Sequence, residues 1–194
     1  MPIEMKGIES KLEKLDEMLD EFDKDVQSLN TIIDLPQATG LIQQCQDQMI
    51  KTLSTLKNEG IKFWLEGHTL LAVCRTGNLL PWETSVEIGM LADDWIAFVE
   101  SKLMTEGKFK LENETTIVPF DEPQMGALKP QVKVRRWLED NGIMRPFDDK
   151  ISEVEKELIL PLVDGTLEDR VFSIPCKSWK FLEIQFGKDW KKTL

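Results

Sequence analysis

The chain has 194 residues, 41% of them hydrophobic and 30% charged, which suits one globular domain with a short appendage and argues against wholesale disorder. Its formal net charge of -11 argues against sequence-independent binding to nucleic acid, which needs a dense basic surface. Three widely spaced cysteines and a single histidine, with no Cys-x-x-Cys pair, argue against a zinc site and predict reduced thiols.

The N-terminal residues give no sign of targeting to a membrane. Residues 1–6 lack the apolar stretch of a signal peptide, and no window of the chain approaches the roughly 18 apolar residues of a membrane span. Reduced thiols are typical of proteins in the cytoplasm and the nucleus. For a complete chain we therefore expect a protein that enters no membrane and resides in the cytoplasm or the nucleus.

A heptad pattern runs through the N-terminal region. Hydrophobic residues recur in steps of three and four, and the positions between them are mostly Glu, Asp and Lys: Met5, Ile8, Leu12, Leu15, Leu19, Phe22, Val26, Leu29 and Ile33. This spacing predicts an amphipathic helix over residues 1–34. Two interpretations stay open, because fewer than four heptads is short for an autonomous coiled coil. The helix either associates with itself or with a partner protein through residues 5–33, or folds back onto its own domain.

Helices and strands are expected to alternate after Pro36, which ends the first helix. The periodicity predicts helices over 37–58, from Gly67 through Val73, over 93–104 with Asp93 as the cap, and over 178–186. It predicts strands over 61–65, 85–90, 108–111, 116–118, 131–137, 158–163 and 170–174, with an Asp164-Gly165 turn between the last two. The order and lengths indicate an α+β domain over residues 35–194.

Two groups of motifs carry a resemblance to a known family. The first group is Thr69-Leu70-Leu71 after a glycine turn, Arg75, Pro81-Trp82, and Ile88-Gly89 in an acidic strand. The second is Leu160-Pro161-Leu162, Pro175-Cys176, Phe186-Gly187 and Asp189-Trp190. In this order the motifs resemble the LicD family, which includes bacterial phosphocholine transferases and the fukutins, and Pro175-Cys176 is closer to the fukutin branch. The resemblance implies a nucleotidyltransferase-like mixed sheet flanked by helices.

The resemblance also implies a metal site, at which this chain departs from the family. Family members carry Asp at the positions of Ser85 and Glu87, and their i, i+2 spacing on a strand points both side chains into one cleft. Such carboxylates hold Mg²⁺ or Mn²⁺ in active members. Glu83 is a further acid at the start of the strand, whereas Lys133 stands where a third carboxylate is implied. We therefore expect no bound metal and no cofactor, with Glu87 as the ligand if an ion binds.

Phosphate-binding residues are implied at the glycine turn. Gly67 is retained where backbone N–H groups at the start of a helix hold phosphate oxygens, and Arg75 matches the arginine of the family. His68 stands where the family has Gly or Ser. We interpret His68 as a local hydrogen-bonding residue, and an acid–base role is the alternative.

One basic cluster is visible in the sequence: Lys133, Arg135, Arg136 and Arg145. Lys133 and Arg135 share one face of the expected strand, so they are candidates for direct binding of a nucleotide or phosphorylated ligand. We expect the four residues instead to pair with the surplus Asp and Glu of the domain.

The tryptophans are expected to pack rather than to bind ligands. We interpret Trp82 as a packing anchor under the acidic strand. A core or interface position is expected for four others: Trp64, Trp95, Trp137 and Trp179.

Three functions are compatible with these residues. The one we favour is a catalytically impaired family member that acts as a binding or scaffold module through its helical N-terminus. The second is an active, metal-dependent transferase of a phospho-sugar, phosphocholine or nucleotidyl group from a nucleotide-activated donor, with Glu83 and Glu87 as metal ligands. The third is a sensor that holds a nucleotide at the Gly67 turn, Lys133 and Arg135 without turnover.

Overall fold

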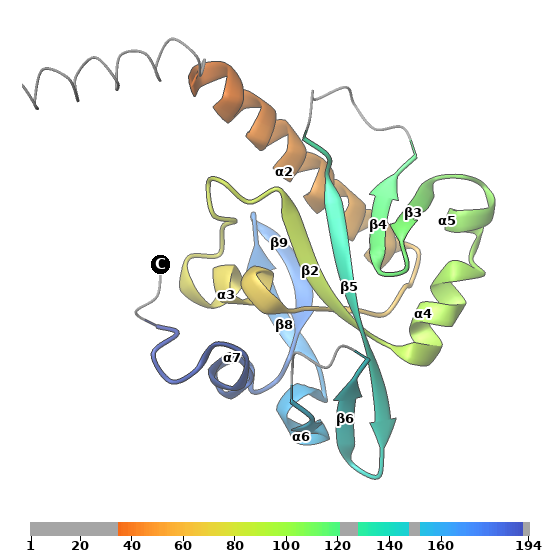
Figure 1. Ribbon diagram of the computed structural model, residues 1–194, viewed down its shortest axis with the longest axis vertical. Coiled ribbons are helices and arrows are strands. Elements are labelled where there is room, and N and C mark those ends of the chain that lie inside the picture. The colour runs from red at the N-terminus through yellow and green to blue at the C-terminus, as the bar shows by residue number, and fades with distance from the viewer. Residues whose placement is uncertain (1–34, 121–127, 148–151, 192–194) are drawn as a thin grey trace, which may run out of the picture. The chain divides into compact units, whose positions relative to one another are not determined.

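The computed structural model describes residues 35–120, 128–147 and 152–191 (Figure 1). The heptad-patterned segment of residues 5–33, and with it the expected helix over 1–34, lies outside the described residues. The chain divides into two compact units, Met1–Gly40 and Leu41–Leu194. Among the described residues, no helix is long and apolar enough to cross a membrane.

A mixed sheet of seven strands forms the centre of the second unit. Its strands are β1 (Trp64–Leu65), β2 (Ser85–Leu91), β3 (Phe109–Asn113), β4 (Thr116–Pro119), β5 (Gln131–Asp140), β6 (Ile143–Pro146) and β7 (Val154–Glu155). The main path is β1-β2-β5-β4-β3, and β6 joins β5 to β7. Strands β2 and β5 are parallel, while the other pairs are antiparallel. A separate hairpin consists of β8 (Val163–Leu167) and β9 (Arg170–Ile174).

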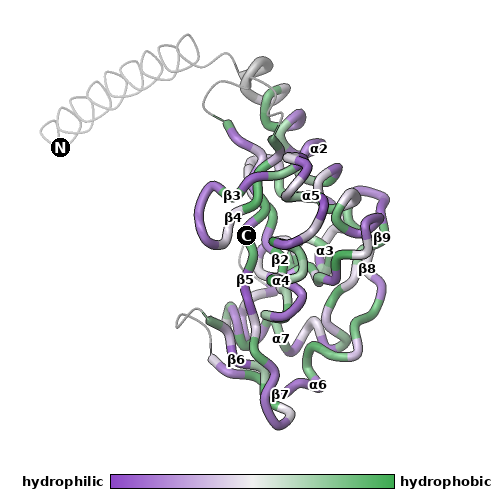
Figure 2. The backbone as a smooth tube through the Cα atoms, turned by 90° about the vertical axis from the view of Figure 1, so that its right-hand side faces the viewer, coloured by the Kyte–Doolittle hydropathy of each residue, from purple (hydrophilic) through white to green (hydrophobic). Residues whose placement is uncertain are grey.

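Six helices flank the sheet in the described part of the chain: α2 (Leu35–Asn58), α3 (Gly67–Arg75), α4 (Ala92–Val99), α5 (Lys102–Thr105), α6 (Lys156–Ile159) and α7 (Ser178–Phe186). Helix α2 buries one apolar face, with Cys45, Met49, Leu53 and Leu56 spaced by three and four residues. In Figure 1, β2 and β5 pass in front of α2. The turns that join β3 to β4 and β5 to β6 are hydrophilic (Figure 2). This arrangement confirms the expected mixed sheet flanked by helices.

Three expectations about element boundaries are wrong. The strand expected over 61–65 is reduced to β1. The helix expected over 93–104 is broken into α4 and α5, and Leu91 rather than Asp93 occupies the cap position of α4. Helix α2 begins at Leu35, so Pro36 lies in its first turn, where the missing N–H of proline removes no helical hydrogen bond.

The final hairpin also turns at a different place from the one expected. Asp164 and Gly165 lie within β8, and the chain reverses at Glu168 and Asp169, which have φ values of 48° and 57°. Positive φ at both central residues is characteristic of the type I′ turn, whose backbone twist matches that of the flanking strands. The start of the strand expected over 158–163 is instead part of helix α6.

The tryptophans divide into buried and exposed residues. Trp64, Trp95 and Trp137 are buried as expected, but Trp82 is 62% exposed and Trp179 is 53% exposed. Trp82 lies in the turn before β2 rather than beneath the strand, so its interpretation as a packing anchor is wrong. Trp179 lies on the outer side of α7 and contacts Trp190, with ring centroids 5.0 Å apart. The three cysteines are free thiols, as expected.

Candidate functional site

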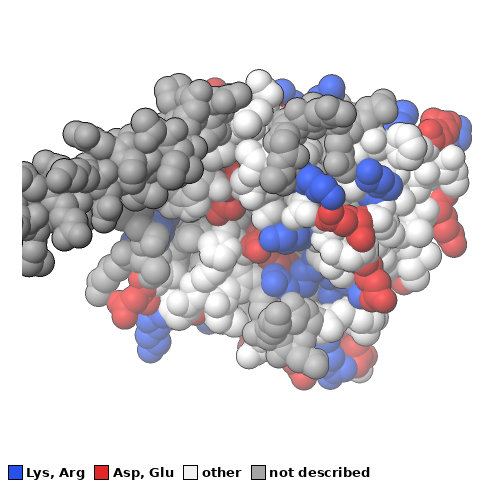
Figure 3. Space-filling model, turned by 45° about the horizontal axis from the view of Figure 1, so that its top comes forward, with Lys and Arg blue, Asp and Glu red and all other residues white. Residues whose placement is uncertain are grey.

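A cleft opens over the parallel strands β2 and β5. Its volume is about 370 Å³, and we call it the β2–β5 cleft after its lining: Glu87, Ile88, Thr115, Thr116, Lys133, Val134 and Arg135. The register places Glu87 beside Lys133 and Gly89 beside Arg135. Lys133 and Arg135 therefore both reach the cleft, as their alternation on one strand face predicts. On the face shown in Figure 3, basic and acidic side chains lie next to each other rather than in one patch of a single sign.

The carboxylate of Glu87 binds the glycine turn at the start of α3. Its Oε2 accepts a hydrogen bond of 2.7 Å from the backbone N–H of His68, and the imidazole Nδ1 of His68 lies 3.5 Å from the same oxygen. Gly67 has a φ of +57°, and a Cβ at this position would collide with the Glu87 carboxylate. The backbone N–H groups and the dipole of a helix N-terminus favour a negative charge there. In this structure Glu87 supplies that charge.

Two further contacts hold the start of α3. The ring of His68 meets the ring of Phe186 from α7 edge to face, with centroids 5.0 Å apart. The next residue, Thr69, accepts a hydrogen bond of 2.8 Å at its hydroxyl oxygen from the backbone N–H of Glu87. The first turn of α3 is therefore fixed to β2 through both the backbone and the side chain of Glu87.

Glu83 lies at the edge of this group, just before β2. Helix α2 fixes the backbone there, because Gln46 donates hydrogen bonds from Nε2 to the carbonyl oxygens of Leu80 (2.8 Å) and Glu83 (3.2 Å). Burial raises the pKa of the Glu83 carboxyl, with a smaller contribution of the same sign from Glu87, while His68 and Lys133 oppose the shift. Glu87, His68 and Lys133 therefore lie close enough to Glu83 to act on its carboxyl electrostatically.

The side chains at this position do not fit a divalent ion held by protein ligands alone. Mg²⁺ and Mn²⁺ prefer several carboxylate oxygens. Here Ser85 offers a neutral hydroxyl, one oxygen of Glu87 is engaged by the His68 N–H, and the residue paired with Glu87 on β5 is a lysine, Lys133. Among the residues that the structure describes, no group of three or more His, Cys, Asp and Glu side chains is arranged for a metal. No ion pair joins Lys133 to Glu87 either, so a salt bridge has not taken the place of the ion.

Glu66 is a feature of the site that sequence reasoning missed. Its side chain is 0% exposed, and it accepts hydrogen bonds from Arg135, from Trp137 Nε1 at 2.9 Å and from Gln185 Nε2 at 3.0 Å. Burial raises the pKa of Glu66, and the Arg135 charge and the Arg135 and Trp137 hydrogen bonds act in the opposite direction. The sequence held one signal that could have identified Glu66 as a site residue. It stands directly before Gly67, at the end of a strand that leads into the glycine turn.

Arg75, the other arginine expected to bind a ligand, and the two remaining arginines of the basic cluster do not line the cleft. Arg75, at the end of α3, donates to the backbone carbonyl of Trp190. Arg136 approaches Glu114 at 4.0 Å, and Arg145 pairs with Asp140 and Glu153 at 2.9 and 3.0 Å. The expected pairing with acidic residues thus holds for Arg135, Arg136 and Arg145. Within the described part of the chain, Lys133 forms no ion pair.

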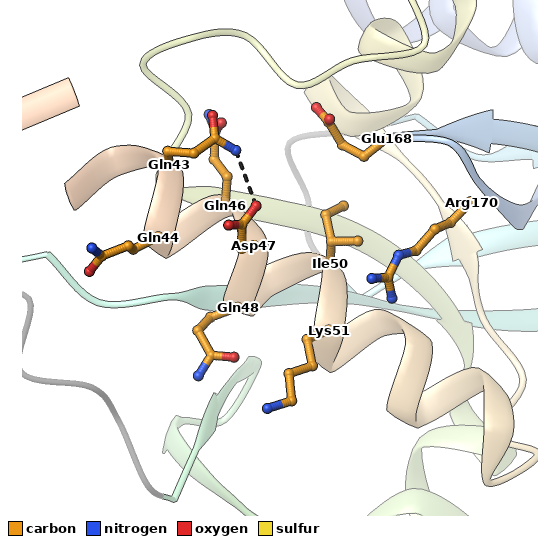
Figure 4. A pocket seen from close by; sticks show the side chains of 9 residues that line it. All are labelled: Gln43, Gln44, Gln46, Asp47, Gln48, Ile50, Lys51, Glu168 and Arg170. Atoms are coloured by element: carbon orange, nitrogen blue, oxygen red, sulfur yellow. Dashed lines mark hydrogen bonds between the residues drawn. The ribbon is translucent and has the colours of Figure 1, made fainter. Parts of the chain in front are cut away.

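A second and larger cavity, of about 600 Å³, lies along helix α2. Most of its lining residues are polar or charged, and all of them are shown in Figure 4: Gln43, Gln44, Gln46, Asp47, Gln48, Ile50, Lys51, Glu168 and Arg170. We call it the α2 cavity. Several of its polar groups are already bound, since Gln43 donates to Asp47 at 3.1 Å and Glu168 accepts from the backbone N–H of Leu79 at 2.8 Å. The α2 cavity shares no lining residue with the β2–β5 cleft.

The mixed sheet, the glycine turn that opens α3 and strand β2 with Glu87 form the arrangement expected of a nucleotidyltransferase fold. The family model described as the LicD/FKTN/FKRP nucleotidyltransferase domain matches residues 60–177. The chain belongs to this family, and the match includes every strand of the sheet and both sides of the β2–β5 cleft.

Two human proteins are similar over most of this chain. Ribitol-5-phosphate transferase FKTN is 24% identical over 146 residues, which are 71% of this chain and 31% of that protein. Ribitol 5-phosphate transferase FKRP is 36% identical over 145 residues, which are 70% of this chain and 29% of that protein. The chain therefore spans less than a third of the length of these relatives.

Proposed function

We propose that this domain transfers a phospho-sugar group of the ribitol-phosphate kind from a nucleotide-activated donor to an acceptor hydroxyl. The names of the two human relatives support the group that is transferred. The observation that carries the assignment to a site is the β2–β5 cleft itself, where Lys133 and Arg135 lie beside two threonines and next to the glycine turn. Its volume of about 370 Å³ is within the usual range for sites that bind small ligands.

The cleft offers fixed positive charge to a donor phosphate. In such a transfer, the acceptor oxygen forms a bond to phosphorus while the bond to the nucleoside monophosphate breaks, and negative charge develops on the phosphate oxygens. Cations held in position before the reaction stabilise that charge most effectively. Lys133 and Arg135 are the cations that line the cleft.

A carboxylate near the cleft is suited to take the proton of the acceptor hydroxyl. A general base works best when its pKa lies close to the working pH, and burial raises the pKa of Glu83 in that direction. We assign this role to Glu83. Glu87 has the different role of fixing the glycine turn through the His68 N–H. These roles of Glu83 and Glu87 involve no bound metal, because the described side chains do not form a site for one by themselves.

A second candidate function is the binding of a ligand without turnover, and the residues at two positions of the site favour it. Ser85 and Lys133 occupy positions at which the family resemblance implies carboxylates. A domain of this kind would hold a nucleotide or a phosphorylated ligand in the same cleft. Its partner protein or second copy would then associate through residues 5–33, outside the described residues.

A donor panel separates the two functions. The chain is incubated with nucleotide-activated ribitol phosphate, sugar phosphates and choline phosphate, in Mg²⁺, Mn²⁺ or chelator, with oligosaccharide acceptors, and release of nucleoside monophosphate is measured. We expect release from the ribitol-phosphate donor, and a loss of about 100-fold in Lys133→Ala, the size typical for removing one group that stabilises transition-state charge. Lys51→Ala, which removes a lysine of the α2 cavity, is the matched control and should not change the rate.

The possible results lead to different conclusions. Donor binding by calorimetry without release in any of the three conditions favours the binding function. If the chain neither binds a donor nor releases nucleoside monophosphate, both candidate functions are contradicted. Activity that needs Mg²⁺ or Mn²⁺ would contradict a transfer that relies on the side chains of the cleft alone. If Glu87→Ala transfers the group at the wild-type rate, Glu87 has no role in the transfer.

A further inference from the structure

We infer that Glu66 is a positioning residue for ligand recognition: its buried carboxylate fixes the Arg135 guanidinium in the orientation that faces donor phosphate oxygens in the β2–β5 cleft. The role rests on the proposed function, because it takes this cleft as the donor site. Glu66 itself reaches no ligand, since its side chain is 0% exposed.

Arg135 connects the interior of the protein to the cleft. Its side chain is 21% exposed and lines the cleft, while its Nη1 donates to Glu66 Oε1. A guanidinium has five N–H donors in a rigid planar fork and stays charged at all relevant pH values. Within the described part of the chain the side chain gives one hydrogen bond, to Glu66, so further N–H donors are left for an anion. Fixing one edge of a planar fork fixes the direction of the other edge.

The surroundings of Glu66 are built to keep this carboxylate in one place. Trp137 Nε1 binds its Oε2, and Gln185 Nε2 binds the same Oε1 that accepts from Arg135. On the neighbouring strand, the residue beside Arg135 is Gly89, where a Cβ would collide with the Trp64 indole and with Glu66 Oε2. The missing side chain of Gly89 therefore gives Glu66 the room to reach Arg135.

Stability alone does not explain a charged pair at this position. Taking a carboxylate and a guanidinium out of water is costly, and buried ion pairs can often be replaced by apolar side chains without loss of stability. Glu66 and Arg135 come from positions 69 residues apart and meet beside a cleft that also contains Lys133. A pair that orients a phosphate-binding guanidinium accounts for both the burial of one partner and the partial exposure of the other.

A double-mutant cycle on ligand binding tests this role. Calorimetry measures the affinity of the whole chain for inorganic pyrophosphate and for four nucleoside diphosphates (ADP, CDP, GDP and UDP). We expect Glu66→Gln to weaken binding about tenfold or more, the scale of one charge-assisted hydrogen bond. Arg135→Met should weaken binding at least as much, and Glu66→Gln should have no further effect in the Arg135→Met background. Glu139→Gln, which breaks the exposed 3.2 Å ion pair with Lys156, is the matched control and should bind like the wild type.

The outcomes distinguish this role from the proposed function. If the wild type binds a probe and Glu66→Gln binds it equally well, or if the two substitutions weaken binding additively, Glu66 does not act through Arg135, while the cleft stays the donor site. If the wild type binds none of the probes, the donor site and the role of Glu66 are both overturned. Should Glu66→Gln fail to fold, Arg135→Lys decides, since it keeps a charge for Glu66 but loses the fork. If Arg135→Lys binds the probes with wild-type affinity, Glu66 is not a positioning residue.

Discussion

Replacing Gly67 by alanine should destabilise the fold through two separate effects. A non-glycine residue in the left-handed region, here at φ +57°, costs about 1–2 kcal/mol. The added Cβ would also collide with the Glu87 carboxylate and displace it from the His68 N–H, and a hydrogen bond to a charged group contributes about 1.5–3 kcal/mol. Together we expect a loss of about 2.5–5 kcal/mol in the free energy of unfolding, measured by urea denaturation.

Two further variants separate the backbone effect from the collision. Gly60 has a φ of +77° and no atom within 4 Å of the added Cβ, so Gly60→Ala should show the backbone cost alone, about 1–2 kcal/mol. In a Glu87→Ala background, Gly67→Ala should also fall to that value, because no carboxylate is left to displace. If Gly67→Ala costs no more than Gly60→Ala in the wild type, Glu87 does not hold the glycine turn, and the reasoning is refuted.

Three further predictions concern pH, exposure and close packing. Because burial raises the pKa of Glu83, its neutral form favours the folded state; this stability is complete below the ordinary carboxyl pKa and is lost as the pH rises through the raised pKa. The melting temperature of Glu83→Gln, relative to that of the wild type, should therefore rise as the pH increases from the ordinary carboxyl pKa through the raised pKa. A difference in melting temperature that does not change with pH would contradict the raised pKa of Glu83. Trp82→Ala should change the unfolding free energy by less than about 0.5 kcal/mol, whereas Trp95→Ala should cost about 3–5 kcal/mol; similar costs would mean that their exposures are wrongly assigned. Gly89→Ala should lose about 1–3 kcal/mol in urea denaturation by overpacking against the Glu66 carboxylate, and a neutral effect would show that the space there is not tight.

Local periodicity predicted most of the strands and helices around the site. The alternation in β2 and β5 is short-range information, so the common face of Lys133 and Arg135 could be read directly from the sequence. The break between α4 and α5 could not, because no Gly or Pro interrupts residues 93–104. The turn of the last hairpin was predicted at the wrong place because Gly165 does not form a turn. A side chain at position 165 would come too close to Ile174 and Val73, and glycine avoids this.

The contacts of the site depend on long-range packing that the sequence does not reveal. Arg135 and Gln185 lie 69 and 119 residues from Glu66, and their meeting follows from the sheet register and the position of α7. The resemblance pointed to Glu83, Ser85 and Glu87, but it did not show that the Glu87 carboxylate binds the helix N-terminus. That contact depends on the approach of β2 to α3, which only the folded chain supplies.

The central claim is that the β2–β5 cleft binds the nucleotide-activated donor, and nuclear magnetic resonance gives its most direct test. A nitrogen-labelled chain is titrated with nucleotide-activated ribitol phosphate, with and without Mg²⁺, while its backbone amide signals are followed. The account predicts shifts centred on His68, Glu87 and Lys133, which surround the glycine turn and the cleft. Shifts confined to the α2 cavity, at residues such as Gln43 and Lys51, or no shifts at all, would contradict it.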